Sequence, residues 1–279
     1  MKPELTYKPG SRTFVPKEQQ GVPFLSCEGL EKTGIVHQGF STRLGGVSKG
    51  CYSTMNISTS RGDDPAAIRE NQRRIAKAIG IEPESMVYTH QVHDTRVARV
   101  GRNDCGTCIP ETDGLITNET GVCLVTFFAD CVPLFFIDRK NRAIGLSHSG
   151  WRGTVGRMGE VTLRRMAEEF GTRSEDVTAA IAPSICQDCY EVSEDVVEQF
   201  RRAFDERLWQ DIFYEKGRGK YQLNLWKANE YVLLEAGIKR ENLFVTTICT
   251  HCNPQILFSH RRTGNQRGNL SAFLALKQE

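Results

Sequence analysis

Short apolar runs separated by polar turns dominate the middle of the chain, from residue 87 to residue 149. They are rich in β-branched and aromatic residues, which are typical of strands. Several are apolar without alternation, and such runs indicate strands that are buried on both faces. Five of these runs are predicted to be strands: residues 97–100, 114–117, 122–128, 133–138 and 143–149.

Helical spacing of apolar residues appears mostly outside this region. Asp64 and Pro65 suit the N-cap and first position of a helix that Gly80 ends. A second helix is predicted over residues 154–170, with Gly171 after it. The remaining predicted elements are helices over residues 193–204 and 224–236 and strands over residues 34–42, 177–181 and 243–248. Because strands gather in the middle and most helices lie outside them, the pattern favours an α+β fold.

The domain organisation follows from length and composition. The chain has 279 residues without an internal repeat or a Pro/Ser-rich linker. We expect residues 1–22 to form an irregular lead-in and residues 23–279 to form a single domain. Hydrophobic residues make up 39% of the chain, which is an ordinary globular composition and excludes disorder of the whole chain.

Charge and hydropathy narrow the possible partners. Lys and Arg number 36 against 34 Asp and Glu without a long basic run, which predicts no nucleic-acid partner. The first 20 residues lack the apolar core of a signal peptide. The most apolar stretch, residues 122–137, is too short to span a membrane and contains Asp130 and Pro133. We therefore expect a cytoplasmic protein without a membrane partner.

Two histidines and a cysteine are candidate metal ligands. They are His93 in THQVHDT, Cys131 in FFADCVPLFF and His148 in GLSHSGWRG. A thiolate and two imidazoles suit zinc or copper, and three protein ligands leave one tetrahedral position open, as in catalytic zinc sites. Because the three residues are far apart in the sequence, the alternative that Cys131 is a small core residue stays open.

Two glycine-rich segments are candidate anion sites. Gly150-Trp151-Arg152-Gly153 joins a predicted strand to a predicted helix, so free N–H groups and an arginine meet close to His148. In the segment 41–48 (STRLGGVS), paired glycines allow close backbone approach, and Arg43 and Ser48 could hold a phosphate or a sugar hydroxyl. A purely structural connection is the alternative in both places.

The ten cysteines include three C-x-x-C pairs: Cys105/Cys108, Cys186/Cys189 and Cys249/Cys252. In a reducing compartment such residues are ligands, reactive thiols or core residues rather than disulfides. Two pairs could form a Cys₄ zinc site if the fold brought them together, and free thiols are the alternative. The basic segment His260-Arg261-Arg262 is either a solvated turn or a lid over an anionic ligand.

Eight segments, taken in order, resemble one family. They read HQGFSTRLGGVSKGCYSTMNIS, GDDPAAIRENQRRIA, THQVHDTRV, TDGLIT, ADCVPLFFID, SHSGWRGT, IAPSICQDCYEV and TICTHCNPQILFSHRRTGNQRG. Together they cover roughly residues 30–275 and resemble the laccase-domain family, once labelled multicopper polyphenol oxidase. That family was later reassigned to zinc-dependent purine nucleoside phosphorylases with adenosine deaminase side activity.

The resemblance implies an α+β body of layered mixed sheets flanked by helices, an α/β/β/α-like arrangement. It implies that the zinc ligands are His93, Cys131 and His148. It also implies a cleft lined by Arg43, Ser48, Asp130 and Arg152. The family often reads IGPCCYEV where this chain has CQDCYEV, so the role of Cys186 stays open, and nothing is implied for Cys105 and Cys108.

We therefore expect phosphorolysis of adenosine and inosine to the free base and ribose 1-phosphate. Arg43 and Arg152, with backbone N–H groups between Gly150 and Gly153, would hold the phosphate. Zinc would neutralise charge on the leaving base. In deamination the metal would instead activate water, and Asp130 is the candidate proton shuttle.

Three alternatives stay open. A copper phenol oxidase would add Met55 or Met86 as an axial ligand, although four coppers need about ten histidines and the chain has six. A thiol hydrolase would use Cys131 as nucleophile with His148 beside it. A zinc-stabilised binding domain would carry no catalysis at all.

Overall fold

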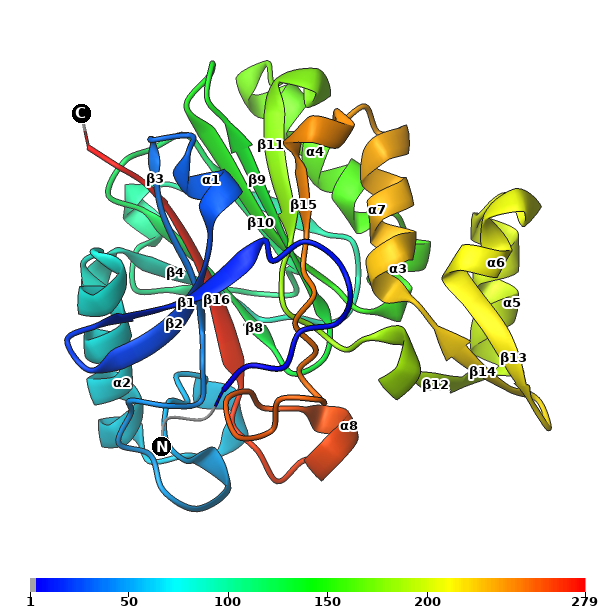
Figure 1. Ribbon diagram of the computed structural model, residues 1–279. Coiled ribbons are helices and arrows are strands. Elements are labelled where there is room, and N and C mark those ends of the chain that lie inside the picture. The colour runs from blue at the N-terminus through cyan, green and yellow to red at the C-terminus, as the bar shows by residue number, and fades with distance from the viewer. Residues whose placement is uncertain (1–3, 279) are drawn as a thin grey trace.

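Two large mixed β-sheets pack face to face, and helices cover their outer faces (Figure 1). The computed structural model describes residues 4–278. The seven-stranded sheet has the order β1 (Phe14–Gln19), β2 (Val22–Cys27), β3 (Val36–Ser41), β16 (Leu270–Leu276), β8 (Cys123–Phe128), β4 (Met86–Thr89), β6 (Cys108–Ile109). The six-stranded sheet has the order β15 (Leu243–Val245), β11 (Val177–Ile181), β9 (Val132–Asp138), β10 (Ala143–Ser149), β7 (Gly114–Thr117), β5 (Val97–Arg99).

The helices form the two outer layers. They are α1 (Glu28–Glu31), α2 (Pro65–Ile79), α3 (Trp151–Val155), α4 (Met158–Phe170), α5 (Glu194–Ala203), α6 (Trp209–Ile212), α7 (Leu225–Glu235) and α8 (His260–Thr263). Helix α2 covers the seven-stranded sheet, and α4 and α7 cover the six-stranded sheet. A small third sheet, β12 (Glu191–Ser193), β14 (Lys220–Leu223) and β13 (Phe213–Gly217), lies with α5 and α6 at one side (Figure 1).

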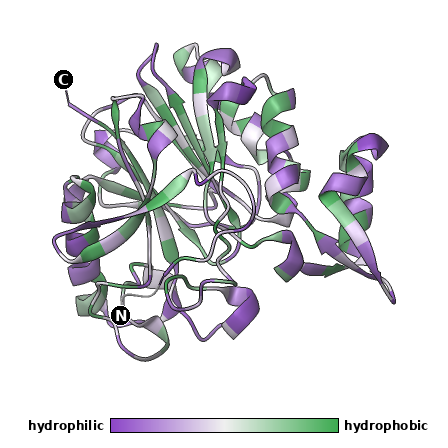
Figure 2. Ribbon diagram, viewed as in Figure 1, coloured by the Kyte–Doolittle hydropathy of each residue, from purple (hydrophilic) through white to green (hydrophobic). Residues whose placement is uncertain are grey.

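Strand β9 shows how the layers are held together. All of its residues are buried, as the unbroken apolar run predicts. Leu134 and Phe136 pack toward α4 and α7, whereas Phe135 and Ile137 belong to the core between the two sheets. Figure 2 shows the same pattern, with hydrophobic residues concentrated in the strands of both large sheets. The predicted α+β fold with an α/β/β/α-like layering is confirmed.

Local signals placed helix α2 correctly. The Asp64 side chain accepts a hydrogen bond from the N–H of Ala66 at 3.0 Å, and Pro65 is the first helical residue. Gly80 ends the helix in the left-handed conformation at φ 84°. Ile75 and Ala78 then pack on the outer face of the seven-stranded sheet.

The helix predicted over residues 154–170 is in fact two helices, α3 and α4. Arg157 has φ 57°, a left-handed conformation that interrupts the helical hydrogen bonds between α3 and α4. The residue before it is a glycine, and a Cβ at Gly156 would lie only 2.7 Å from the Thr95 methyl group. Arg157 is held in that conformation by an ion pair with Glu235 at 2.9 Å. The short helix α3 therefore begins directly after β10.

Two further expectations need correction, and one strand was not predicted. Residues 14–19, predicted to be irregular, form β1 because they pair along their whole length with β2. The strand predicted over residues 243–248 ends at Val245. Strand β16, an apolar run (LSAFLAL) that the sequence analysis left unassigned, lies between β3 and β8. Residues 1–3 and 279 of the predicted lead-in and domain lie outside the described residues.

Among the described residues, no helix combines the length and the apolar character that crossing a membrane requires.

Candidate metal and ligand site

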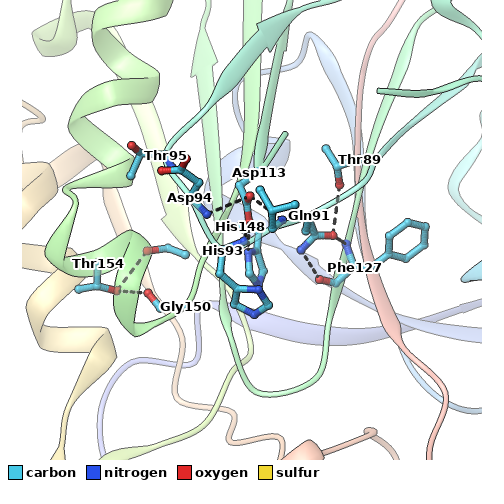
Figure 3. Close-up of polar contacts among 12 residues, drawn as sticks. Thr89, Gln91, His93, Asp94, Thr95, Asp113, Phe127, His148, Gly150 and Thr154 are labelled. Carbon is cyan, nitrogen blue, oxygen red and sulfur yellow. Dashed lines mark hydrogen bonds and ion pairs between the residues drawn. The ribbon is translucent and has the colours of Figure 1, made fainter. Parts of the chain in front are cut away.

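The structure brings His93, Cys131 and His148 together at one end of the sheets. His93 lies in the loop after β4, Cys131 lies between β8 and β9, and His148 lies in β10. One ligand atom from each lies within 4.8 Å of the others. The rings of His93 and His148 meet edge to face with centroids 4.9 Å apart (Figure 3). In the β9–β10 pairing, Ser149 lies opposite Val132, which places Cys131 beside Gly150 just past the end of the ladder.

These donors fit a transition-metal ion. Zinc binds imidazole nitrogen at about 2.0 Å and thiolate sulfur at about 2.3 Å, so donors on one tetrahedral ion are about 3.3–3.8 Å apart. The observed grouping within 4.8 Å needs little movement to reach that arrangement. All three residues line the same cleft, so an ion held by them would keep a coordination position open to a ligand.

Asp113 organises this group, and sequence reasoning assigned it no role. Its fully buried carboxylate accepts hydrogen bonds from the N–H groups of Val92, His93 and Asp94 at 2.9, 3.1 and 3.1 Å. It also contacts Nδ1 of His148 at 2.8 Å (Figure 3). That contact leaves Nε2 of His148 for a metal, which is the usual arrangement of a metal-bound histidine. The TDGLIT segment quoted above contains Asp113, but a lone aspartate there carries no local signal.

The three donors also set one another's charge. Burial opposes ionisation of Cys131, but His148 and His93 outweigh it and lower the pKa of the thiol to about 6. Burial alone would lower the pKa of His148, whereas the Cys131 sulfur and the Asp113 carboxylate raise it to about 9. The Asp113 pKa is lowered, because His148 and the loop N–H groups outweigh the effect of burial. These contacts favour the thiolate form of Cys131, which is the form that binds a cation.

Two residues at the site have backbone conformations that are uncommon for side chains other than glycine. His93 has φ 62° and Asp130, which precedes Cys131, has φ 90°. Such conformations cost roughly 1–3 kcal/mol and persist only where the surroundings hold them. The Asp130 carboxylate accepts hydrogen bonds from the Thr250 hydroxyl and the Arg261 N–H, both at 2.6 Å.

Asp130 therefore ties two distant segments to Cys131. These are the turn that contains Thr250 and helix α8, which begins at His260. Both carboxylate oxygens are used inside the protein, and Asp130 is not among the residues that line the cleft. The proton-shuttle role predicted for it stays a prediction.

Gly150 lies against all three donors. A Cβ at this position would lie 3.1 Å from Cys131 Sγ and 3.3 Å from His93 Cδ2. At Gly153 the nearest atom to a Cβ would be 3.5 Å away, which is ordinary contact. A side chain at position 150 would therefore press on two of the metal ligands, whereas one at position 153 would meet ordinary contacts.

The cleft has a volume of about 950 Å³, within the range of small-molecule sites. One wall is aromatic, because the rings of Tyr88 and Phe127 stack with centroids 6.0 Å apart and both line the cleft. Gln91 fixes the end of this wall by accepting from the Phe127 N–H at 2.8 Å and donating to its carbonyl at 2.9 Å (Figure 3).

Two arginines that sequence reasoning missed, Arg61 and Arg267, form a cationic part of the cleft. The Nε atom of each is buried and has no hydrogen-bond partner among residues 4–278. Burial and the neighbouring Arg61 lower the pKa of Arg267 to about 10, which leaves the Arg267 guanidinium charged at pH 7. Two arginines that line one cleft indicate a site for an anion.

The structure does not bring Arg43 and Ser48 to this cleft. The Arg43 guanidinium donates to the carbonyls of Ser53 at 3.0 Å and Pro254 at 2.9 Å. The Ser48 hydroxyl donates to the Asp63 carboxylate at 2.6 Å and is buried. These polar atoms hold the glycine-rich loop to its neighbours, and neither side chain lines the cleft.

Arg152 also lies outside the residues that line the cleft. Its guanidinium lies over the ring of Trp151, 4.3 Å from the centroid. Helix α3 has only five residues, so its dipole adds little to an anion site. The phosphate-binding role predicted for Arg152 and the adjacent glycines stays a prediction.

The chain is similar to several known proteins. A family model described as multi-copper polyphenol oxidoreductase laccase matches residues 37–277. The chain is 34% identical to a protein named purine nucleoside phosphorylase YlmD from Bacillus subtilis, over 86% of this chain and 88% of that protein. It is 33% identical to a protein named adenosine deaminase RL5 from an unknown prokaryotic organism, over 87% and 92% of the two chains. The crystal structure of YlmD from Geobacillus stearothermophilus superposes with a TM-score of 0.89 at 32% identity, covering 96% of this chain and all of that one.

Replacing Asp113 by asparagine should weaken metal binding. An amide has one acceptor oxygen in place of two, so the four donors around it cannot all be satisfied. We expect Asp113→Asn to lower the affinity for Zn²⁺ by about 10- to 100-fold, measured by chelator competition. Asp94→Asn on the same loop is the matched control and should leave the affinity unchanged, and equal affinities in the two variants would contradict the role of Asp113.

The two glycines next to His148 should respond differently to alanine. Gly150→Ala places a methyl group against Cys131 and His93 and should reduce Zn²⁺ affinity at least about tenfold, because the donors must move apart. Gly153→Ala meets only ordinary contacts and should retain wild-type affinity. Isothermal titration of the metal-free proteins measures both, with thermal unfolding to show that each variant is folded.

Proposed function

The chain belongs to the multi-copper polyphenol oxidoreductase laccase family, and from this premise we propose that it is a zinc-dependent purine nucleoside phosphorylase. The family resemblance inferred from the sequence is thereby confirmed. The proposed reaction converts adenosine or inosine and phosphate into the free base and ribose 1-phosphate, with slower deamination of adenosine. The names of the relatives support an enzyme that acts on purine nucleosides.

One observation carries the proposal: two half-buried arginines, Arg61 and Arg267, line the same cleft as the metal donors. The Arg61 guanidinium is held by a hydrogen bond from Nη2 to the Asn265 carbonyl, and that of Arg267 by one from Nη1 to the Gly268 carbonyl. Both side chains line the cleft, and phosphate oxygens are the acceptors that guanidinium groups match best. Arg267 also lies close enough to Cys131 for the charge of the thiolate to affect the pKa of Arg267. A phosphate on these arginines therefore lies near the three metal donors.

The aromatic wall suits the other substrate. Tyr88 and Phe127 offer a flat apolar surface along which a purine base can stack. With the base on this wall and phosphate on Arg61 and Arg267, the ribose lies between them. The cleft thereby holds both reactants in one place, which converts a two-molecule reaction into a reaction within one complex.

The chemistry follows from the charges that develop. A phosphate oxygen forms a bond to C1′ of the ribose while the C1′–N9 bond breaks, and its electron pair passes to the purine, which takes up a proton. Arg61 and Arg267 would orient the nucleophile. His93, Cys131 and His148 would hold zinc, which supplies a Lewis acid in the cleft.

A thiol hydrolase is the second candidate, because one observation favours it. Cys131, His148 and Asp113 form a thiolate, imidazole and carboxylate series like that of cysteine nucleophiles. Its activity would survive a chelator and disappear with thiol alkylation, whereas the proposed phosphorylase would lose activity with both.

The copper oxidase receives less support. Met55 and Met86, offered as axial ligands, are buried in the core cluster beneath α2 and do not line the cleft. A binding domain without catalysis would show zinc but no turnover. The cytoplasmic location and the absence of nucleic-acid partners stay predictions.

Phosphate dependence is the direct test of the proposed activity. Inosine should release hypoxanthine only when phosphate is present, and ribose 1-phosphate should accumulate in equal amount, as measured by chromatography. Ammonia release from adenosine should be slower, and Cys131→Ser should reduce both activities because both are proposed to need the same metal. Hypoxanthine release at an unchanged rate in phosphate-free buffer would refute the phosphorylase and indicate a hydrolase.

The arginine pair predicts which variants lose phosphate. Arg61→Met and Arg267→Met should each reduce kcat/KM for phosphate by an amount equivalent to about 2–4 kcal/mol, because an oxyanion clamp is lost. Steady-state kinetics with varied phosphate measure this, with inosine binding as a separate readout. The variant Arg152→Met is measured alongside them, because the sequence analysis predicted that Arg152 binds the phosphate. A large loss in Arg152→Met with normal kinetics in Arg61→Met and Arg267→Met would assign phosphate to the α3 segment instead.

A further inference from the structure

Four cysteines meet at a second place, outside the cleft. Cys186 and Cys189 follow β11, and Cys249 and Cys252 follow β15. Their sulfur atoms all lie within 4.8 Å of one another, although nearly 60 residues separate Cys189 from Cys249. The third C-x-x-C pair, Cys105 and Cys108, belongs to no such group among the described residues.

The sheet brings the two pairs together. Strands β11 and β15 are parallel neighbours, so both chains leave the sheet at the same edge. Beyond the strands the two segments stay paired. Ser184 and Cys249 form an isolated parallel β-bridge, and the Thr250 N–H donates to the Ser184 carbonyl at 3.1 Å. The grouping of the four sulfur atoms therefore rests on backbone pairing rather than on flexible surface side chains.

We propose that Cys186, Cys189, Cys249 and Cys252 bind a structural zinc ion in a closed Cys₄ site. Zinc–sulfur bonds of about 2.3 Å in a tetrahedron place the sulfur atoms about 3.8 Å apart. The sulfur atoms of Cys189 and Cys252 are already 3.5 Å apart. An iron–sulfur cluster fits less well, because its thiolates bind different irons and must spread further apart.

The surroundings suit a site of this charge. The Cys186 N–H donates to the Cys249 sulfur at 3.2 Å, and N–H donors to metal-bound thiolates are the usual outer contacts of such sites. Cys186 and Cys249 are buried, and Cys189 and Cys252 are partly buried. With all four sulfur atoms engaged, the ion has no position open to a ligand, so its role is structural.

The proposed ion would stabilise the turn that holds Asp130 next to Cys131. Thr250 lies between Cys249 and Cys252, and its hydroxyl holds Asp130, the residue before Cys131. The N-terminal segment also contacts this region. Tyr7 and Ile248 form an isolated antiparallel β-bridge, and Lys8 forms an ion pair with Asp188 at 2.8 Å. A zinc ion here fixes the turn that keeps Asp130 in its left-handed conformation.

Metal content tests the proposal independently of nucleoside turnover. We expect the double variant Cys189→Ser/Cys252→Ser to contain one zinc ion per chain fewer than the wild-type protein. Both proteins are purified under reducing conditions, and their zinc content is measured by plasma mass spectrometry. Cys105→Ser/Cys108→Ser is the matched control and should keep the wild-type content. Cys131→Ser reports on the other site, so the difference is readable whatever that site holds. Equal zinc in the two double variants overturns the proposal.

Cobalt substitution covers the case in which the double serine variant does not fold. Co²⁺-loaded wild-type protein should show the intense thiolate-to-metal charge-transfer absorption of a tetrathiolate site. Cys131→Ser should retain most of that absorption, since the four-cysteine group supplies four of the five thiolate ligands. Loss of the band in Cys131→Ser, or a disulfide within the group in intact-mass spectra of the reduced preparation, overturns the proposal.

Discussion

The candidate site depends on the hydrogen bonds that the buried carboxylate of Asp113 accepts. A fully buried charge is costly unless hydrogen bonds satisfy it, and here three loop N–H groups and one imidazole do so. That requirement folds residues 92–94 around the carboxylate and holds His93 at φ 62°. The same carboxylate fixes the orientation of the His148 ring. One residue therefore positions two of the three metal donors.

The layered sheets supply the frame in which this interaction works. Asp113 directly precedes β7, and β7 pairs with β10, which carries His148. The β9–β10 pairing then places Cys131 beside Gly150. Because both faces of these strands are buried, a shift of register would move side chains such as Leu134 and Phe135 into the wrong cores. The packing of the two cores thus fixes the geometry of the donors.

The cleft itself departs from what stability alone would favour. Among residues 4–278 the Nε atoms of Arg61 and Arg267 are buried without a partner, and Asp130, the neighbour of the cleft residue Cys131, has a left-handed backbone. Such features cost free energy, and the protein also carries them away from the cleft, as at the Thr172 hydroxyl and the Gln20 backbone. The surrounding protein offsets them, since the Asp130 carboxylate is fully hydrogen-bonded and Gln91 fixes the adjacent end of β8. The proposed ligand would complete what the protein leaves open.

The sequence by itself determined the elements whose signals are local. Asp64, Pro65 and Gly80 mark α2, and unbroken apolar runs mark β9 and β10. Motifs shared with a known family also indicated the three metal donors. Only the tertiary structure decided that Asp113, Arg61 and Arg267 belong to the site, that two C-x-x-C pairs meet, and that Arg43 serves loop packing. The physical reason is that these roles arise from strand order and register between distant segments, which no local pattern records.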